Sequence, residues 1–270
     1  MQVSGKVFVV TGAGNGIGRE VTRQLLARGA RVVALDLRGE SLEEMAQLAG
    51  APAEALSLHA VDVSDAAAVD AVMAEAMARF GAIDGLLNVA GIIQPFVKLV
   101  DLDVAAMHKV MDVNFWGVVH TTKALLPQLL ARPEACIVNV SSMGGFTPVP
   151  GQAVYGASKA AVKLLTEALY AECRGSKVAV TVVYPGGVGT GIATNSGVMV
   201  AGGGQQAAQE AGAFPTTSAA EAGRIIVEAV EKGPYRVLIG KDATMLDRLS
   251  RLSPRRATEL IAKKMAALLG

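Results

Sequence analysis

Residues 7–29, VFVVTGAGNGIGREVTRQLLARG, join a short apolar run to a glycine-rich turn and then to an amphipathic helix pattern. The run Val7 to Val10 is continuously apolar, which is typical of a strand buried on both faces of a sheet. Thr11 to Gly18 then spell T-G-x-x-x-G-x-G, which is neither a G-x-G-x-x-G fingerprint nor a Walker A loop. Backbone N–H groups at a helix start attract phosphate, and glycines allow its close approach. The stretch favours a phosphate-binding turn, although any tight turn between strand and helix can use the same glycines.

The same alternation of apolar runs and helix patterns continues along the chain. Strand-like runs lie at residues 31–36, 56–63, 83–91, 136–142, 178–189 and 236–240, and helix patterns at 41–50, 65–81, 101–130 and 153–172. Buried strands that alternate with helices predict a parallel sheet covered on both faces. We expect an α/β, Rossmann-like doubly wound sandwich with a mainly parallel seven-stranded sheet. No Pro/Gly/Ser-rich linker divides the chain, so residues 1–270 are predicted to form a single dinucleotide-binding and catalytic domain.

Composition narrows the classes of function. With 270 residues, 51% of them hydrophobic, the chain can bury a large core, and its net charge of +1 gives no argument for a nucleic-acid partner. Cys136 and Cys173 lack metal-ligand spacing, so we expect no metal site and two buried thiols in a reducing compartment. The N-terminus lacks the features of a signal peptide, and no apolar run approaches the roughly 20 residues of a transmembrane segment. We therefore expect a soluble, cytoplasmic protein.

Two segments depart from the alternating pattern. Residues 186–218 form a long irregular stretch, and a loop of that length in a compact domain is usually functional or disordered. The tail, residues 241–270, is predicted to be helical and carries seven Lys or Arg against three Asp or Glu, a net charge of +4. A solvated helix face or a subunit contact explains this tail better than peripheral contact with a membrane does.

A Ser, a Tyr and a Lys occur at spacings that make chemical sense together. Tyr155 and Lys159 are four residues apart in a helix pattern, so their side chains share one face and can meet. The ammonium would stabilise the phenolate and lower the pKa of Tyr155 toward that of a usable acid or base. Ser142 ends a strand-like run and can orient the oxygen whose proton Tyr155 moves. Taken alone, a Tyr-x-x-x-Lys pair is more often an amphipathic helix with a surface lysine.

Other polar residues follow the predicted strands at their carboxyl ends, where ligands bind in open α/β sheets. Asp36 ends the second strand, and a carboxylate there can accept hydrogen bonds from an adenosine ribose and repel a 2′-phosphate. NAD is therefore favoured over NADP, and Arg38 is expected to be solvated rather than to soften that repulsion. Five residues after the next two strands are expected near the adenine or the pyrophosphate: Asp62 and Val63, then Asn88, Ala90 and Gly91.

Together these residues resemble the short-chain dehydrogenase/reductase family, of the single-domain length, over nearly all of the chain. The matching motifs are TGAGNGIG from Thr11 to Gly18, Asp62-Val63, NVAG from Asn88 to Gly91, Asn114, Ser142, YGASK from Tyr155 to Lys159, and PGGVGT from Pro185 to Thr190. Taken in order at these spacings, the motifs are highly specific. The chain departs from the family at Val89, where many members carry a second Asn, and we expect a change in packing with little loss of function.

The resemblance implies a catalytic tetrad of Asn114, Ser142, Tyr155 and Lys159. Tyr155 would be the acid/base, Lys159 would lower its pKa and hold the nicotinamide ribose, and Ser142 would bind the substrate oxygen. Asn114 would hold a water that links Lys159 to solvent, and the alternative is an Asn that kinks its helix by bonding its own backbone. The coenzyme set comprises Gly12, Asn15, Gly16, Ile17, Gly18, Asp36, Leu37, Asp62, Val63, Asn88, Ala90, Gly91, Tyr155, Lys159, Pro185, Gly186, Val188 and Thr190.

The resemblance also implies hydride transfer between a secondary alcohol or ketone and the nicotinamide of the coenzyme. It favours a functional loop over a disordered one at residues 186–218 and implies a substrate lid there. Residues near the expected pocket, including Val198 to Val200 of the lid, are mostly apolar or small. Apart from Lys98, no Lys or Arg lies in these windows to bind a carboxylate. We predict a neutral, hydrophobic substrate, although most of these side chains could be core. The expected substrate contacts are Ser142, Gln94, Met143, Gly144, Phe146, Gln152 and Tyr155.

Two other functions stay open. The nearer is an NADP-dependent carbonyl or 3-oxoacyl-thioester reductase, but an acyl-carrier partner would need a basic entrance, which the sequence shows only in the tail. The other is a dinucleotide-binding protein without catalysis, which would be expected to lose Ser142, Tyr155 or Lys159. Because members of the family commonly form tetramers, a homodimer or homotetramer is expected.

Overall fold

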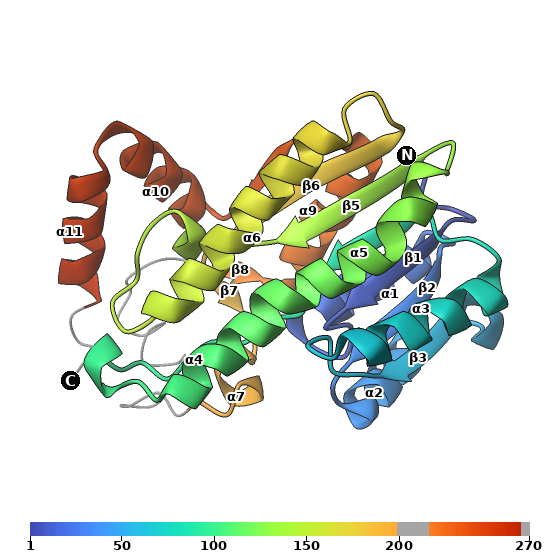
Figure 1. Cartoon of the computed structure of the whole chain (residues 1–270), viewed down its shortest axis with the longest axis horizontal. Helices are drawn as coiled ribbons and strands as arrows, with labels where there is room; N and C mark the ends of the chain where they lie inside the picture. The colour runs from blue at the N-terminus through green and yellow to red at the C-terminus, as the bar shows by residue number, and fades with distance from the viewer. Residues whose placement is uncertain (199–215, 266–270) are drawn as a thin grey trace.

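The computed structural model describes residues 1–198 and 216–265, and its centre is a seven-stranded parallel sheet (Figure 1). The strands lie in the order β3-β2-β1-β4-β5-β6-β9, and every neighbouring pair is parallel. Their bounds are β1 (Val7–Thr11), β2 (Arg31–Asp36), β3 (Leu56–Ala60), β4 (Gly85–Asn88), β5 (Ala135–Val140), β6 (Val178–Pro185) and β9 (Arg236–Ile239). The predicted α/β architecture with seven strands is confirmed, and the sheet is parallel throughout.

Helices cover both faces of this sheet (Figure 1). One face carries α1 (Gly16–Ala27), α2 (Gly39–Ala49) and α9 (Ala219–Lys232), and the other carries α3 (Ala66–Phe80), α5 (Gly117–Leu130) and α6 (Ala153–Glu172). Successive side chains of a strand point to opposite faces. Accordingly, Phe8 and Val10 of β1 join the core under α1, α2 and α9, whereas Val7 and Val9 join the core under α3, α5 and α6. This double burial explains why the strands are continuously apolar in sequence.

The chain reverses its direction of travel across the sheet between β1 and β4. From β1 it proceeds outward through β2 to β3, then crosses to β4 on the other side of β1, where Thr11 lies in register with Asn88. Two neighbouring strands whose following connections leave in opposite directions open a crevice at their carboxyl ends, which is where ligands bind in such sheets. The fold therefore places its binding site at the ends of β1 and β4.

The predicted helix over residues 101–130 is interrupted by a wider turn. It begins with α4 (Val104–Met111), passes through a π-helical turn (Asp112–Trp116) and continues as α5. Single π turns inside α-helices occur frequently at functional sites. This one contains Asn114, whose side chain is fully buried.

The two ends of the predicted lid form a small sheet of their own. β7 (Val188–Gly189) pairs in parallel with β8 (Thr217–Ser218), and the short helix α7 (Ile192–Asn195) follows β7. Most of the predicted lid, residues 199–215 with Met199 and Val200, lies outside the described residues.

The tail is helical over its described part, as predicted, with α10 (Lys241–Leu252) and α11 (Pro254–Lys264). Short 3₁₀ turns occupy Ala53–Ala55, Leu99–Asp101 and Met143–Gly145. The sequence reading did not delimit α9, although Ser218 caps its start by accepting from the Glu221 N–H, and apolar residues follow at helical spacing.

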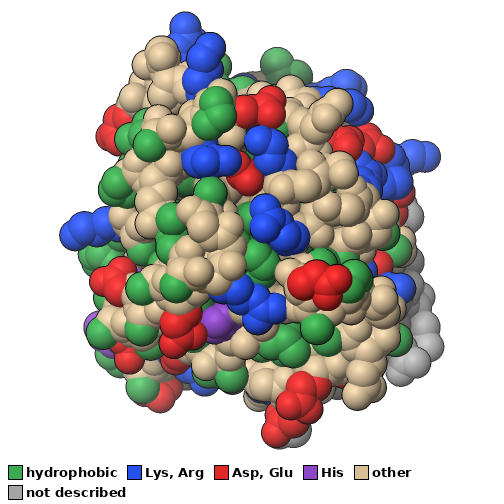
Figure 2. All heavy atoms as spheres, turned by 90° about the vertical axis from the view of Figure 1, so that its right-hand side faces the viewer, with side chains coloured by type: hydrophobic (Ala, Val, Ile, Leu, Met, Phe, Trp, Pro, Cys, Tyr) green, Lys and Arg blue, Asp and Glu red, His purple; other side chains and the backbone are tan. Residues whose placement is uncertain are grey.

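The molecule's surface agrees with the near-neutral net charge. On the face that includes β3, α2 and α3, basic and acidic side chains are interspersed with hydrophobic ones (Figure 2). No helix within residues 1–198 and 216–265 is both long enough and apolar enough to cross a membrane.

Candidate active site

A cleft of about 710 Å³ opens at the carboxyl ends of β1, β2, β4, β5 and β6. Eighteen of the residues predicted to bind coenzyme or substrate line it: Gly12, Asn15, Gly16, Ile17, Gly18, Asp36, Leu37, Asp62, Val63, Ala90, Gly91, Ser142, Tyr155, Lys159, Pro185, Gly186, Val188 and Thr190. The crevice expected from the sheet topology therefore gathers residues from seven separate segments of the sequence.

The glycine-rich turn between β1 and α1 leaves no room for side chains. A Cβ on Gly18 would lie 2.0 Å from the Gly12 carbonyl oxygen, and one on Gly12 would lie 2.9 Å from the Cα of Ala90. Gly12 also has a φ of +68°, which L side chains rarely adopt. Across the cleft, a Cβ on Gly16 would lie 3.2 Å from Thr190 Cγ2. The backbone of this turn is thus exposed to the cleft at the N-terminus of α1, where an anion is favoured.

One buried polar atom at this turn has no partner. Asn15 precedes α1, but its side chain makes no capping hydrogen bond, and its Nδ2 is buried without an acceptor. Because buried donors are normally paired, an unused donor on a residue that lines the cleft fits a ligand that supplies acceptor oxygens. The turn therefore fits the pyrophosphate of a dinucleotide coenzyme.

Asp36 holds the turn from the end of β2. One carboxylate oxygen, Oδ2, accepts a hydrogen bond from Gly14 N at 2.9 Å, and the other, Oδ1, accepts from Arg38 N at 3.1 Å. Asp62 is likewise engaged locally, because its Oδ1 accepts from both the N–H and the hydroxyl of Ser64. Both carboxylates still line the cleft.

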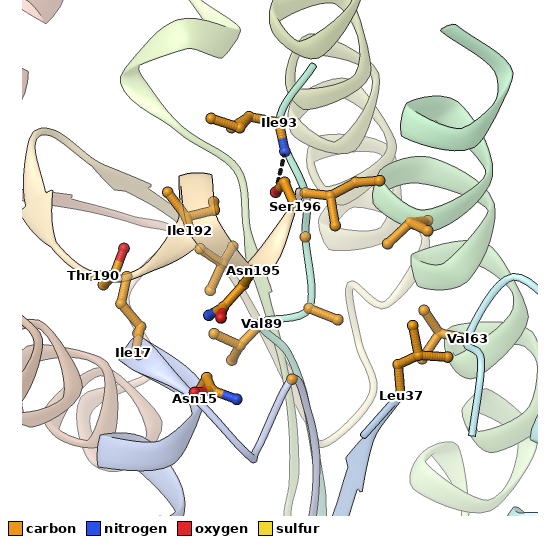
Figure 3. Close-up of a pocket in the computed structure, with 18 of the residues that line it drawn as sticks. Asn15, Ile17, Leu37, Val63, Val89, Ile93, Thr190, Ile192, Asn195 and Ser196 are labelled. Atoms are coloured by element: carbon orange, nitrogen blue, oxygen red, sulfur yellow. Dashed lines mark hydrogen bonds between the residues drawn. The ribbon is translucent and has the colours of Figure 1, made fainter. Parts of the chain in front are cut away.

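Arg38 is exposed, as expected, and it also lines the cleft. Its guanidinium donates a 2.9 Å hydrogen bond to Asn195 Oδ1 at the end of α7. The next residue, Ser196, accepts a 3.0 Å hydrogen bond from the Ile93 N–H after β4 (Figure 3). The segment 192–196 is thus tied to both rims of the cleft.

The Ser142, Tyr155 and Lys159 side chains meet at the inner end of the cleft. A hydrogen bond joins Ser142 to Tyr155, and Ser142 Oγ also accepts from Gly144 N at 3.0 Å. Lys159 is 4% exposed, and its Nζ donates to the Val140 carbonyl oxygen at 3.0 Å. The strand end of β5 and the first turns of α6 therefore present one hydroxyl, one phenol and one ammonium to the same space.

The pKa of Tyr155 is shifted opposite to the sequence prediction. Burial raises the pKa of the phenol above its usual value, and the hydrogen bond with Ser142 lowers it only in part. Burial also lowers the pKa of the Lys159 ammonium to about 8, because the charged form is poorly solvated. As the structure stands, Tyr155 keeps its proton at neutral pH, while Lys159 is largely charged.

Asn114 connects three segments around this group. Its Oδ1 accepts from Ile92 N at 2.8 Å, and its Nδ2 donates to Ile92 O at 2.9 Å and to Ser158 Oγ at 3.0 Å. The partners belong to the loop after β4 and to α6, so the alternative of an Asn that bonds its own helix backbone is wrong. A Cβ on Gly91 would lie 3.0 Å from Lys159 Nζ and 3.3 Å from Asn114 Oδ1, so a larger residue there would press on both side chains.

The prediction that the Asn88 side chain lies at the coenzyme site is corrected by the structure. Its side chain is buried, donates to Asn139 Oδ1 at 2.9 Å and accepts from the Thr121 hydroxyl at 2.7 Å, so it faces the core instead of the cleft. The backbone after it is positioned by Thr11, whose Oγ1 accepts from the N–H groups of Val89 and Ala90. Thr11 thus positions the backbone after β4, a role that its place in the TGAGNGIG motif did not indicate.

The prediction that Gln94 and Gln152 contact the substrate is corrected by the structure, in which both side chains bond to the protein backbone. Gln94 Oε1 accepts from the N–H groups of Val154 and Tyr155 at the start of α6, and its Nε2 donates to Gly151 O. Gln152 Nε2 donates to Gln94 O at 2.8 Å. The two amides join the loop after β4 to the N-terminus of α6, and neither lines the cleft. Their hydrogen bonds thus fix the start of α6, which carries Tyr155, relative to the loop after β4.

The three remaining predicted contacts also lie outside the cleft. Phe146 packs edge to face against Tyr184, with ring centroids 5.3 Å apart, and lines a separate depression of about 470 Å³ together with Gly144. Met143 lines neither cavity. Gly144 nevertheless lies close to the catalytic group, because a Cβ there would lie 3.4 Å from Tyr155 Cε1.

Several residues that line the cleft were missed from the sequence. They include Ser64 after β3, then His108, Lys109 and Asp112 on α4 and its π turn, and finally Ile192, Asn195 and Ser196 beyond β7. Asn195 and Ser196 fall in the predicted lid but have no motif of their own. The α4 residues precede Asn114 within two helical turns, and that proximity was the one available signal. Among the described residues, no cluster of three or more His, Cys, Asp or Glu could hold a metal ion.

Comparisons with known proteins agree with this geometry. The family model for short chain dehydrogenase matches residues 6–200. A Mycobacterium tuberculosis relative, named as oxidoreductase SadH, is 37% identical over 267 residues, covering 97% of this chain and 96% of the relative.

Two solved structures share the fold over almost their whole length. A short-chain dehydrogenase/reductase from Burkholderia phymatum, in complex with NAD, has a TM-score of 0.85 and 27% identity, with 96% of this chain and 97% of that chain covered. The 3-ketoacyl-(acyl-carrier-protein) reductase from Brucella melitensis, complexed with NADH, has a TM-score of 0.79 and 27% identity, with 89% and 98% covered.

Proposed function

The chain belongs to the short-chain dehydrogenase/reductase family of NAD(P)-dependent oxidoreductases, and we propose that it uses NAD to interconvert a neutral, hydrophobic secondary alcohol and its ketone. The observation that carries the proposal is the buried group of Ser142, Tyr155 and Lys159 at the inner end of a cleft that begins at a glycine-rich turn. When bound, the nicotinamide ring accepts or supplies the hydride.

Residues of the cleft's outer part are proposed to hold the coenzyme. The backbone from Gly12 to Gly18 and the Asn15 side chain would hold the pyrophosphate, and Asp36 would bind the adenosine ribose. Leu37, Asp62 and Val63 would flank the adenine. Asp36 supports NAD over NADP because its carboxylate would repel a 2′-phosphate. The NAD and NADH complexes of the two similar structures agree with this choice.

The proton is proposed to move through Tyr155. A raised pKa makes its phenol a donor at neutral pH, so in the reducing direction it would protonate the substrate oxygen while Ser142 donates a second hydrogen bond to that oxygen. The phenolate left behind would be stabilised by the Lys159 ammonium one helical turn away. In the oxidising direction the same phenolate would accept the hydroxyl proton. A water held by Asn114 would reconnect Lys159 with solvent.

The substrate is proposed to be neutral because apolar side chains border the cleft on the substrate side. Ile92, Ile93 and Ile192 line it there, and Lys98 does not. Of the residues that the structure describes, three Lys or Arg line the cleft. Lys159 belongs to the proposed catalytic group, Arg38 immediately precedes α2, and Lys109 lies in the last turn of α4. The test is a panel of secondary alcohols, ketones and keto acids with NAD(H) and with NADP(H). Clear preference for charged keto acids would overturn the proposal.

One observation favours a second candidate, an NADP-dependent carbonyl or 3-oxoacyl-thioester reductase. Arg38 lines the cleft two residues after Asp36, and its guanidinium could pair with a 2′-phosphate if it released Asn195. The same panel separates the candidates, because this one requires higher kcat/KM with NADPH than with NADH.

The assembly is proposed to be a homodimer or homotetramer. Trp116 on the π turn and Leu164 on α6 are 47% and 67% exposed, and the two elements contact each other, so an interface between copies at this surface would cover both apolar side chains. Light scattering on the purified protein measures the mass directly, and a monomer at micromolar concentration would overturn this part.

A further inference from the structure

A buried carboxylate beneath the cleft has no role in the reaction described above. Asp242 lies in the first turn of α10 and is 3% exposed. Its Oδ2 accepts a 2.6 Å hydrogen bond from Gly187 N, while its Oδ1 is buried without a partner. Among the described residues, no Lys or Arg forms an ion pair with it.

Such a carboxylate is costly to bury, so stability alone does not explain it. The N-terminus of α10 offsets part of that cost, because the positive end of a helix favours an anion. The chain also makes room for it. A Cβ on Gly186 would lie 2.2 Å from Asp242 Oδ1, and a Cβ on Gly240 would lie 2.3 Å from the same atom. Glycines on two segments thus admit one acidic side chain.

The segment that Asp242 holds is the far wall of the cleft. Gly186, Gly187, Val188 and Thr190 all line the cleft. Backbone hydrogen bonds fix the turn on either side of Asp242, from Gly186 N to Ile239 O and from Thr217 N to Gly187 O, each 2.8 Å. Thr190 stands against Gly16 at the opposite wall, so the position of the turn sets the width of the cleft there.

We propose that Asp242 is a positioning residue for the coenzyme: through Gly187 it holds the 186–190 segment against the nicotinamide end. This rests on the proposed placement of that end beside Pro185 to Thr190. Asp242 lies beyond residues 6–200, which the family model matches, so the C-terminal helices take part in the site through this contact.

The test compares two ligands that differ only at the nicotinamide end. Dissociation constants for NADH and for ADP-ribose, which lacks the nicotinamide, are measured for the wild type, Asp242→Ala and Asp242→Asn. Losing a hydrogen bond to a charged acceptor should raise the Kd for NADH about tenfold in Asp242→Ala. Asp242→Asn keeps an acceptor for Gly187 and should lose only about threefold. The Kd for ADP-ribose should stay within about twofold of the wild type in both variants.

Asp247→Asn is the matched control. Asp247 is on the same helix and is also largely buried, but it pairs with Arg236 and Arg251 away from the turn. Its loss should lower the melting temperature without changing either Kd. Equal weakening of NADH and ADP-ribose in the Asp242 variants, or unchanged NADH binding, would overturn the proposal. Because the readout is binding, a wrong substrate class would leave this result intact.

Discussion

The two walls of the cleft are held by different kinds of contact. On the coenzyme wall, the turn from Gly12 to Gly18 packs backbone against backbone so closely that a methyl group does not fit. On the opposite wall, side-chain amides and hydroxyls from Gln94, Asn114 and Ser196 tie loops together. The first wall is defined by missing side chains, so it should not tolerate additions. The second is defined by side chains that are present, so it should not tolerate truncations.

Tyr155→Phe should give the largest effect. Removing the phenol oxygen leaves the substrate without its proton donor, and turnover should fall by at least about a thousandfold. NADH binding should persist, because the ring and the helix are unchanged. Steady-state rates and NADH fluorescence titration check the two halves. Retained turnover would remove Tyr155 from the acid/base role.

Gly18→Ala tests the wall that should not tolerate additions. The new Cβ would meet the Gly12 carbonyl oxygen, so the turn must shift, at a cost of about 1–3 kcal/mol in the free energy of unfolding. The variant should no longer bind NADH, which isothermal titration calorimetry measures. Gly39→Ala is the control, because the nearest atom to its Cβ is 3.8 Å away, and it should change stability by less than about 0.5 kcal/mol. Normal NADH binding by Gly18→Ala would contradict the tight-turn account.

Two substitutions of Asp36, on the same wall, separate the effect of its charge from the effect of its hydrogen bond with Gly14. Asp36→Ala should weaken NAD binding about tenfold and relax discrimination against NADP, since both the ribose contact and the Gly14 hydrogen bond are lost. Asp36→Asn keeps an acceptor for Gly14 but removes the charge, so it should relax discrimination with a smaller loss of NAD affinity. Unchanged preference in both variants, measured as kcat/KM ratios, would mean that Asp36 does not read the ribose.

Gln94→Ala tests the wall that should not tolerate truncations. Without the Gln94 oxygen, the N–H groups of Val154 and Tyr155 lose their acceptor, and Tyr155 should become less well placed. We expect kcat to fall about tenfold while the Kd for NADH stays constant. Gln94→Glu, which keeps acceptor oxygens at this helix start, should recover part of kcat. A change in KM alone, for one substrate, would instead support direct contact.

The pH dependence of ketone reduction should give the smallest effect. Because burial lowers the pKa of Lys159 to about 8, its charge is present below that pH and lost above it, so the phenolate loses its stabilising ammonium as pH rises. The kcat should therefore decline above pH 8, toward about tenfold per unit. In Lys159→Arg the guanidinium stays charged, and the decline should disappear. The same decline in that variant would assign it to another group.

The sequence predicted most of the coenzyme wall because its residues form recognisable motifs within short segments. The glycines, Asp36 and most of the predicted strand-end residues line the cleft, and Asn88 is the exception. Gln94 and Gln152 were assigned to the substrate because an amide near a pocket fits a ligand contact and a loop contact equally well. Only the fold shows that Gln94 bonds to the backbone of the loop before α6 and that Gln152 bonds to the backbone of the loop after β4.

The sequence does not indicate contacts between distant segments or the degree of burial of a side chain. Arg38 and Asn195 are 157 positions apart, and no local pattern links them. The sequence correctly predicted that Ser142 lies beside Tyr155, but it predicted the wrong direction for the pKa shift of Tyr155. A sequence indicates which charged residues are near a phenol, but it does not indicate how deeply that phenol is buried.

The π turn at Asp112–Trp116 has a consequence for how this helix can vary. A π turn arises when one extra residue is accommodated within an α-helix, and the residues on either side are thereby rotated relative to a regular helix. Deleting one residue here would give a straighter helix with regular bonding, yet it would swing Asn114 away from Ile92 and Ser158. Length changes are usually tolerated in loops, but at this helix the register itself is part of the site.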